Sequence, residues 1–121
     1  MKPNLLFKLS GIILLINGLA AAFTSDLFLK GAGMTLDPDG ITTAQAFGAS
    51  LIALGITVFR IPSFVGNIKE AITTVIIGYL TFVVLISVHL INGQAEGPTP
   101  VVNLILNIIF IILYLIARRK V

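Results

Sequence analysis

The chain has 121 residues, which allows one domain, and 57% of them are hydrophobic while only 11% are charged. Soluble domains carry charge on about a quarter of their residues, so this composition excludes a soluble protein and predicts a membrane protein. The net charge of +3 comes from basic residues beside apolar segments, where anionic lipid attracts them, so we do not expect nucleic acid as a partner. Because cysteine is absent, disulfides, iron–sulfur clusters and zinc–cysteine sites are excluded.

Four apolar stretches are long enough to cross a bilayer as helices, which takes about 20 residues each. We therefore expect an all-α integral membrane protein, a four-transmembrane-helix bundle forming one domain over residues 1–121. The spans are predicted at about 3–23, 43–61, 68–91 and 100–117. The first span resembles a secretory signal, but its apolar run from Leu5 to Phe23 is long enough to span, so we expect it to be retained.

The first loop and the second span have recognisable boundary signals. Residues 25–31 predict a short amphipathic helix lying on the outer surface, and residues 37–40, Asp-Pro-Asp-Gly, predict a turn. Thr42 and Gln45 have the spacing of a capping box, which predicts the start of the second span, and Pro62 predicts its end.

The third and fourth spans are bounded in a similar way. Asn67 and Glu70 have the capping spacing at the start of the third span, and Thr99 predicts the N-cap of the fourth, before Pro100. The links after the second and third spans are short. Consecutive helices joined by short links are usually antiparallel neighbours, so we expect the second span to pack against the third, and the third against the fourth.

The positions of the basic residues predict the orientation of the spans. Seven of the eight flank span ends on one side of the bilayer: Lys2, Lys8, Arg60, Lys69, Arg118, Arg119 and Lys120. Only Lys30 falls on the other side, together with the acids Asp26, Asp37, Asp39 and Glu96. Lys and Arg in short loops favour the cytoplasm, so both termini are predicted to be cytoplasmic.

Small residues recur at helical spacing along the spans and predict close packing of helices. The glycines expected at helix contacts are Gly11, Gly18, Gly48, Gly55 and Gly78. Such contacts can lie within one bundle or between subunits, and we favour packing within one bundle because a four-helix bundle needs such faces internally.

Five polar side chains fall at similar depths in the outer halves of the four spans: Asn17, Gln45, His89, Asn103 and Asn107. One interpretation is a polar pocket under the first outer loop that binds a lipid headgroup, a quinone ring or a similar amphiphile. The other is that these side chains form hydrogen bonds between helices. Fewer polar side chains lie in the cytoplasmic halves, namely Ser10, Thr57, Thr73 and Tyr114.

Reactive groups are scarce in this sequence. No Asp or Glu lies within a predicted span, which excludes a transporter that depends on an intramembrane carboxylate. His89 is the only histidine, and to hold a haem it would need a second ligand, which only Met34 or a second copy of the chain could supply. We therefore expect no enzyme activity, no catalytic residues, no metal site and no cofactor.

Residues 44–55, Ala-Gln-Ala-Phe-Gly-Ala-Ser-Leu-Ile-Ala-Leu-Gly, are followed by Arg60. This stretch resembles the second helix of small bacterial tetraspan membrane proteins, whose families are labelled only as domains of unknown function. The resemblance covers the four-helix plan and implies a multi-pass protein of the bacterial inner membrane. It implies no catalytic residue.

These observations predict a non-enzymatic protein that acts as a structural or assembly subunit, either of a larger membrane complex or of a homo-oligomer. An alternative is a lipid-binding or carrier protein that holds an amphiphile in the outer-leaflet pocket. A third possibility is a subunit that completes a haem or quinone site together with a partner chain.

Overall fold

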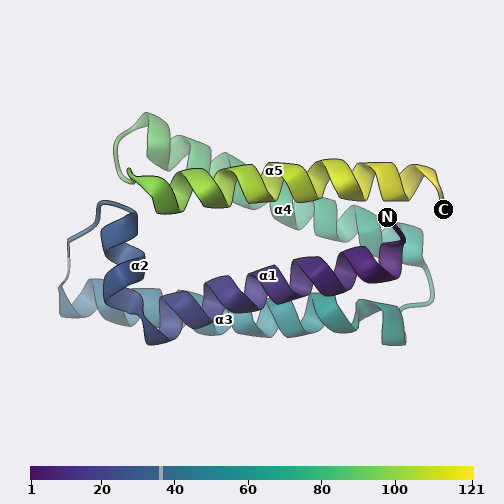
Figure 1. Ribbon diagram of the computed structural model, residues 1–121, viewed down its shortest axis with the longest axis horizontal. Coiled ribbons are helices and arrows are strands. Elements are labelled where there is room, and N and C mark those ends of the chain that lie inside the picture. Colours follow the sequence, from purple (N-terminus) through teal and green to yellow (C-terminus); the bar gives the residue numbers. More distant parts are fainter. Residues whose placement is uncertain (36) are drawn as a thin grey trace.

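The computed structural model describes residues 1–35 and 37–121, and the regular structure in these residues is helical. Its helices are α1 (Pro3–Phe23), α2 (Ser25–Gly31), α3 (Pro38–Phe64), α4 (Ile68–Ile91) and α5 (Pro98–Arg119) (Figure 1). Apart from the short α2, all of them are long and apolar enough to cross a membrane. The prediction of four such helices is confirmed, and they indicate a multi-pass membrane protein.

The long helices are arranged as two pairs, α1 with α3 and α4 with α5 (Figure 1). The pairing of α4 with α5 agrees with their short link. The expected packing of α3 along α4 is wrong, because these two helices share few contacts despite their short link. The reason is that α1 occupies the glycine face of α3, so the link holds α3 and α4 together only at its own end.

Glycines bring the backbones of α1 and α3 close together. A Cβ atom added at Gly18 would lie 2.8 Å from the carbonyl oxygen of Gly48, and one added at Gly48 would lie 2.6 Å from that of Gly18. Gly11 and Gly55 form the equivalent contact seven residues away on each helix. At these distances a side chain would collide with backbone, so glycine is required at all four positions.

Helix α3 is longer than the sequence suggested. Asp37 is its N-cap, since the carboxylate accepts a hydrogen bond from the Gly40 backbone N–H at 2.6 Å, and Pro38 occupies the first position. The turn predicted at 37–40 is therefore wrong, because Asp followed by Pro is also a strong helix-start signal. The predicted capping residues Thr42 and Gln45 lie inside the helix, and the helix continues past Pro62.

The starts of α4 and α5 give one agreement and one correction. The side chain of Asn67 accepts a hydrogen bond from the Glu70 backbone N–H at 3.2 Å, which confirms the predicted cap of α4. Helix α5 begins at Pro98 rather than after Thr99, and Gly97 precedes it with a φ of +89°. Only glycine adopts that conformation readily. The start of α5 is therefore set by the backbone of Gly97 and not by a side-chain cap.

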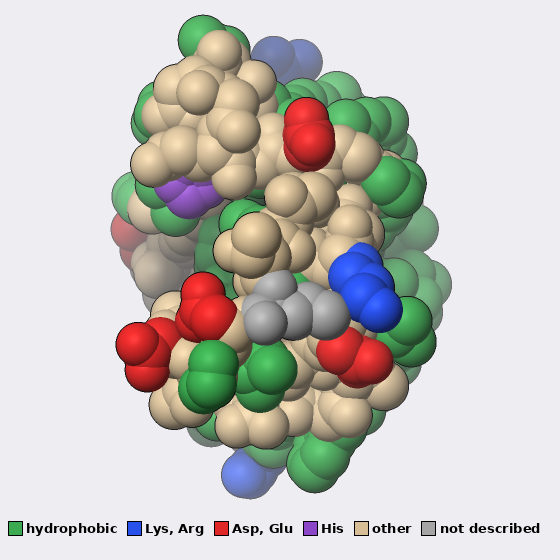
Figure 2. All heavy atoms as spheres, turned by 90° about the vertical axis from the view of Figure 1, so that its left-hand side faces the viewer, with side chains coloured by type: hydrophobic (Ala, Val, Ile, Leu, Met, Phe, Trp, Pro, Cys, Tyr) green, Lys and Arg blue, Asp and Glu red, His purple; other side chains and the backbone are tan. Residues whose placement is uncertain are grey.

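Charged side chains separate to the two ends of the bundle. The end that carries α2, here called the α2 end, bears Asp26 and Lys30 of α2, Asp37 and Asp39 at the start of α3, and Glu96 between α4 and α5 (Figure 2). The opposite end, here called the termini end, holds both chain termini (Figure 1). The other seven basic residues lie in the helix turns and links nearest that end.

The two helix pairs are joined at both ends of the bundle. Toward the termini end, Phe7 of α1 packs against Tyr114 of α5 with ring centroids 5.3 Å apart, and both side chains are fully buried. At the α2 end, the Glu96 backbone N–H donates a hydrogen bond to the Ala32 carbonyl at 2.9 Å, which joins the two loops. Between these junctions residues of both pairs share one buried core, and residues of both pairs also line the two cavities described below.

Candidate functional site

Three of the five predicted polar residues lie together. Asn17 of α1 and Asn103 and Asn107 of α5 line one cavity of about 50 Å³ in the half of the bundle nearer the α2 end, here called the amide cavity. Gln45 is exposed on α3, and His89 is half-buried near the end of α4. Neither of these two lines any of the cavities described here.

The amide cavity combines polar walls with an aromatic cover. The Asn107 side-chain amide donates to the Asn103 backbone carbonyl at 2.6 Å, a bond within α5. Phe28 of α2 and Phe47 of α3 also line the cavity, with their ring centroids 6.2 Å apart. The three asparagines are the polar part of a lining that is otherwise apolar, and a space of this size holds a few water molecules or one small group.

A shallower depression of about 300 Å³ lies beside the amide cavity, between α1, α2 and the start of α5. Asn17, Phe28 and Asn103 line both spaces. Asn17 and Asn103 therefore border both an interior cavity and a depression at the side of the bundle, whereas Asn107 lines only the interior cavity.

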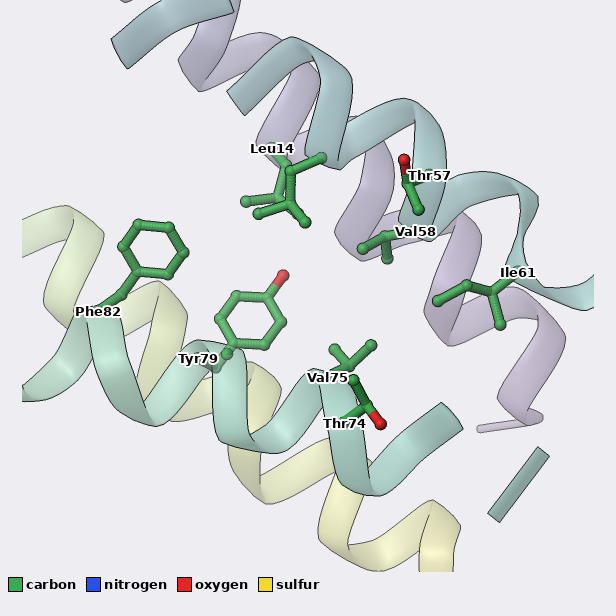
Figure 3. Close-up of a pocket in the computed structure, with 10 residues that line it drawn as sticks. Leu14, Thr57, Val58, Ile61, Thr74, Val75, Tyr79 and Phe82 are labelled. Atoms are coloured by element: carbon green, nitrogen blue, oxygen red, sulfur yellow. The ribbon is translucent and has the colours of Figure 1, made fainter. Parts of the chain in front are cut away.

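A cavity of about 260 Å³, larger than the amide cavity, lies between α3 and α4 and is here called the midplane groove (Figure 3). Leu54, Thr57 and Val58 line it from α3, and Thr74, Gly78 and Tyr79 line it from α4. Several of these residues are exposed at the side of the bundle, so the groove opens laterally, toward the space that lipid fills in a membrane. The sequence did not predict it, because it results from the divergence of α3 and α4.

The two cavities are adjacent. Leu14 of α1 and Phe82 of α4 line both the midplane groove and the amide cavity. These two apolar side chains therefore form the partition between an almost wholly apolar space and a space lined by amides. A molecule that occupied both spaces would pass between them.

Tyr79 is the polar group that sequence reasoning missed. Its side chain is 5% exposed, and its hydroxyl has no hydrogen-bond partner among the described residues. The hydroxyl points from α4 across the midplane groove toward Leu14 (Figure 3). A buried hydroxyl without a partner costs about 1–3 kcal/mol. The only feature of the sequence that could have identified this group is the position of a tyrosine in the middle of a very apolar span.

The neighbouring buried hydroxyls are satisfied. Ser10 of α1 and Tyr114 of α5 share a hydrogen bond of 2.5 Å, and Ser10 also donates to the Phe7 carbonyl at 3.3 Å. The ring of Tyr79 lies beside that of Tyr114, with centroids 6.2 Å apart. These contacts fasten α1 to α5 and fix the position of the Tyr79 ring.

The five glycines expected at helix contacts divide into two groups. Gly11, Gly18, Gly48 and Gly55 lie between α1 and α3 of the same chain. A Cβ atom added at Gly78 would meet no atom within 4 Å, because this glycine borders the midplane groove. Gly78 therefore leaves space beside α4 that no other part of the described chain fills.

In residues 1–35 and 37–121, no three His, Asp or Glu side chains lie close enough together to hold a metal ion. No protein-family model matches the chain, and no curated protein or solved structure matches it. The resemblance to small bacterial tetraspan proteins stays a prediction.

Proposed function

We propose that this protein is a non-enzymatic membrane protein that binds an amphiphile between its two helix pairs. The observation that supports this most directly is the adjacency of the two cavities at Leu14 and Phe82, one apolar and one lined by amides. An amphiphile needs an apolar space joined to a polar one. The amides of Asn17, Asn103 and Asn107 suit its polar group, and the midplane groove suits its apolar part.

The charge distribution supports a definite orientation for this site. The termini end carries seven of the eight basic residues, so in this proposal it faces the cytoplasm. The α2 end then faces the opposite side, and the amide cavity lies in the outer half of the bilayer with α2 above it. In a bacterium this membrane is the inner membrane.

The groove offers a route of entry from the membrane itself. Thr74 and Gly78 are exposed along its α4 side, and Leu54 and Thr57 along its α3 side. An amphiphile dissolved in the bilayer could reach the amide cavity through this side opening without crossing the loops. Lateral entry fits a binding or carrier protein whose ligand partitions into lipid.

A comparison of three forms of the full-length protein tests this function. The wild type, Gly78→Leu and Gly66→Leu are purified in a mild detergent, and their bound molecules are extracted and measured by mass spectrometry. Gly78→Leu fills the midplane groove. Gly66→Leu adds the same side chain in the α3–α4 link, where an added Cβ atom would meet no atom within 4 Å.

We expect one molecular species to be enriched in the wild type and in Gly66→Leu and to be depleted from Gly78→Leu. If all three forms carry the same lipids in the proportions of the surrounding membrane, the proposed function is wrong. Other polypeptides present at fixed stoichiometry in place of a small molecule would instead favour the predicted role as a subunit.

A further inference from the structure

The hydroxyl of Tyr79 is a hydrogen-bond donor without an acceptor. Among the described residues, it is the only buried side-chain oxygen or nitrogen that lacks a partner. The other hydroxyls in the midplane groove are occupied within their own helices, since Thr57 donates to the Ala53 carbonyl and Thr74 to the Glu70 carbonyl. The groove therefore presents one free donor in an otherwise apolar wall.

Nearby protein groups do not supply the missing acceptor. Ser10 is the closest candidate, and its hydroxyl bonds to Tyr114 and to the Phe7 carbonyl, but no hydrogen bond of ordinary geometry joins it to the Tyr79 hydroxyl. Buried hydroxyls in proteins nearly always find a partner. A partner for Tyr79 is thus expected to come from whatever occupies the groove.

The depth of Tyr79 restricts what that partner can be. Tyr79 lies eleven residues after Ile68 and twelve before Ile91, so it sits at the middle of α4, roughly 17 Å from either end. The ester carbonyls of bilayer lipids lie at the edge of the hydrocarbon core, about 15 Å from its centre. A lipid in its ordinary position places only hydrocarbon at this depth and cannot accept the hydrogen bond.

We propose that the midplane groove binds a membrane-dissolved, mostly apolar molecule that carries a carbonyl oxygen, and that the Tyr79 hydroxyl donates a hydrogen bond to this oxygen. A quinone ring is one molecule with this chemistry. The inference rests on the proposed function and adds the chemical class of the ligand. The size is suitable, because a dry apolar cavity of about 150 Å³ already binds benzene, and this groove measures about 260 Å³.

Two matched compounds test the role of the hydroxyl. Benzophenone has a carbonyl between two phenyl rings, and diphenylmethane has the same rings without the carbonyl. The full-length wild type, Tyr79→Phe and Gly78→Leu are reconstituted in lipid nanodiscs. Photocrosslinking of benzophenone locates its binding site. Competition with diphenylmethane compares the affinities of the two compounds. Infrared spectroscopy of carbonyl-labelled benzophenone reports directly whether the carbonyl accepts a hydrogen bond.

We expect benzophenone to label the α3 and α4 residues of the groove in the wild type, with its carbonyl stretch at the lower frequency typical of a hydrogen-bonded ketone. Tyr79→Phe should abolish that frequency shift and weaken benzophenone binding about three- to tenfold, while the affinity for diphenylmethane stays the same. Gly78→Leu should prevent both compounds from binding.

Two results would overturn the inference, and they differ in what they say of the proposed function. If both compounds bind in the groove with equal affinity and Tyr79→Phe changes neither, the carbonyl class is wrong while amphiphile binding stands. If benzophenone does not label the groove and Gly78→Leu alters the oligomeric state, a second copy of the chain covers the groove, and both proposals fail.

Discussion

Gly11 and Gly55 contact each other reciprocally across the α1–α3 interface. A Cβ atom on either glycine would lie 2.8 Å from the carbonyl oxygen of the other. Neither backbone can move away without disturbing the second contact, between Gly18 and Gly48, which lies seven residues along each helix. The α1–α3 pair is therefore the most constrained part of the molecule.

The first prediction concerns this interface. Gly55→Ala should destabilise the protein by about 1–3 kcal/mol, because the added methyl group collides with backbone and forces the two helices apart. Gly78→Ala is the matched control, since its methyl group meets no atom within 4 Å and alanine favours a helix by about 0.5–1 kcal/mol over glycine. The measurement is the free energy of unfolding in mixed detergent micelles. Equal effects of the two changes would contradict the interface described here.

The second prediction contrasts two buried tyrosines. Tyr114→Phe removes the 2.5 Å hydrogen bond to Ser10 and should cost about 1 kcal/mol of unfolding free energy. Tyr79→Phe removes a hydroxyl without a protein partner, so the stability of the ligand-free protein should stay the same or rise. A double-mutant cycle of Ser10→Ala with each tyrosine change should show coupling only for Tyr114. Coupling between Ser10 and Tyr79 would mean that these two hydroxyls bond in solution.

A third prediction addresses the contact between α2 and α3. Phe28 packs against Phe47, and an aromatic pair of this kind contributes about 0.5–1.5 kcal/mol. Phe28→Ala should therefore speed hydrogen exchange of the α2 backbone amides about two- to tenfold. The control is Leu27→Ala, because Leu27 is 65% exposed on the same helix. If Leu27→Ala speeds hydrogen exchange of α2 as much as Phe28→Ala does, the contact between Phe28 and Phe47 does not stabilise α2.

The fourth prediction concerns orientation and uses the absence of cysteine from the sequence. A single cysteine at Glu96→Cys should react with a membrane-impermeant maleimide added to intact cells, because the basic termini end is expected to face the cytoplasm. Ser63→Cys, in the last turn of α3, should react only after the membrane is permeabilised. The opposite labelling pattern would reverse the proposed topology.

The number and type of long helices could be predicted from the sequence, because hydropathy and the length needed to cross a bilayer restrict the possibilities strongly. Details at the helix ends were less predictable. Asp37 and Pro38 fit a turn and a helix start equally well as a sequence pattern, and the structure shows a helix start, with Asp37 as the N-cap and Pro38 as the first helical residue. Thr99 was a reasonable cap, but α5 begins at Pro98, two residues earlier than predicted, with Gly97 at the N-cap position.

The candidate site was only partly accessible to sequence reasoning. Depth along a helix can be read from residue numbers, and Asn17, Asn103 and Asn107, which were placed at one level, line one cavity in the structure. The direction that a side chain faces depends on which helices pair. Gln45 has the expected depth but is exposed, and the midplane groove exists only because α3 pairs with α1 rather than with α4.

The pairing of helices also divides the chain into two contiguous halves. The first pair uses only residues 3–64 and the second only residues 68–119. The first pair can therefore be complete in the membrane before the second has been synthesised. A break in the α3–α4 link, near Gly66, should leave two fragments that each fold as a helical hairpin and reassemble when they are expressed together.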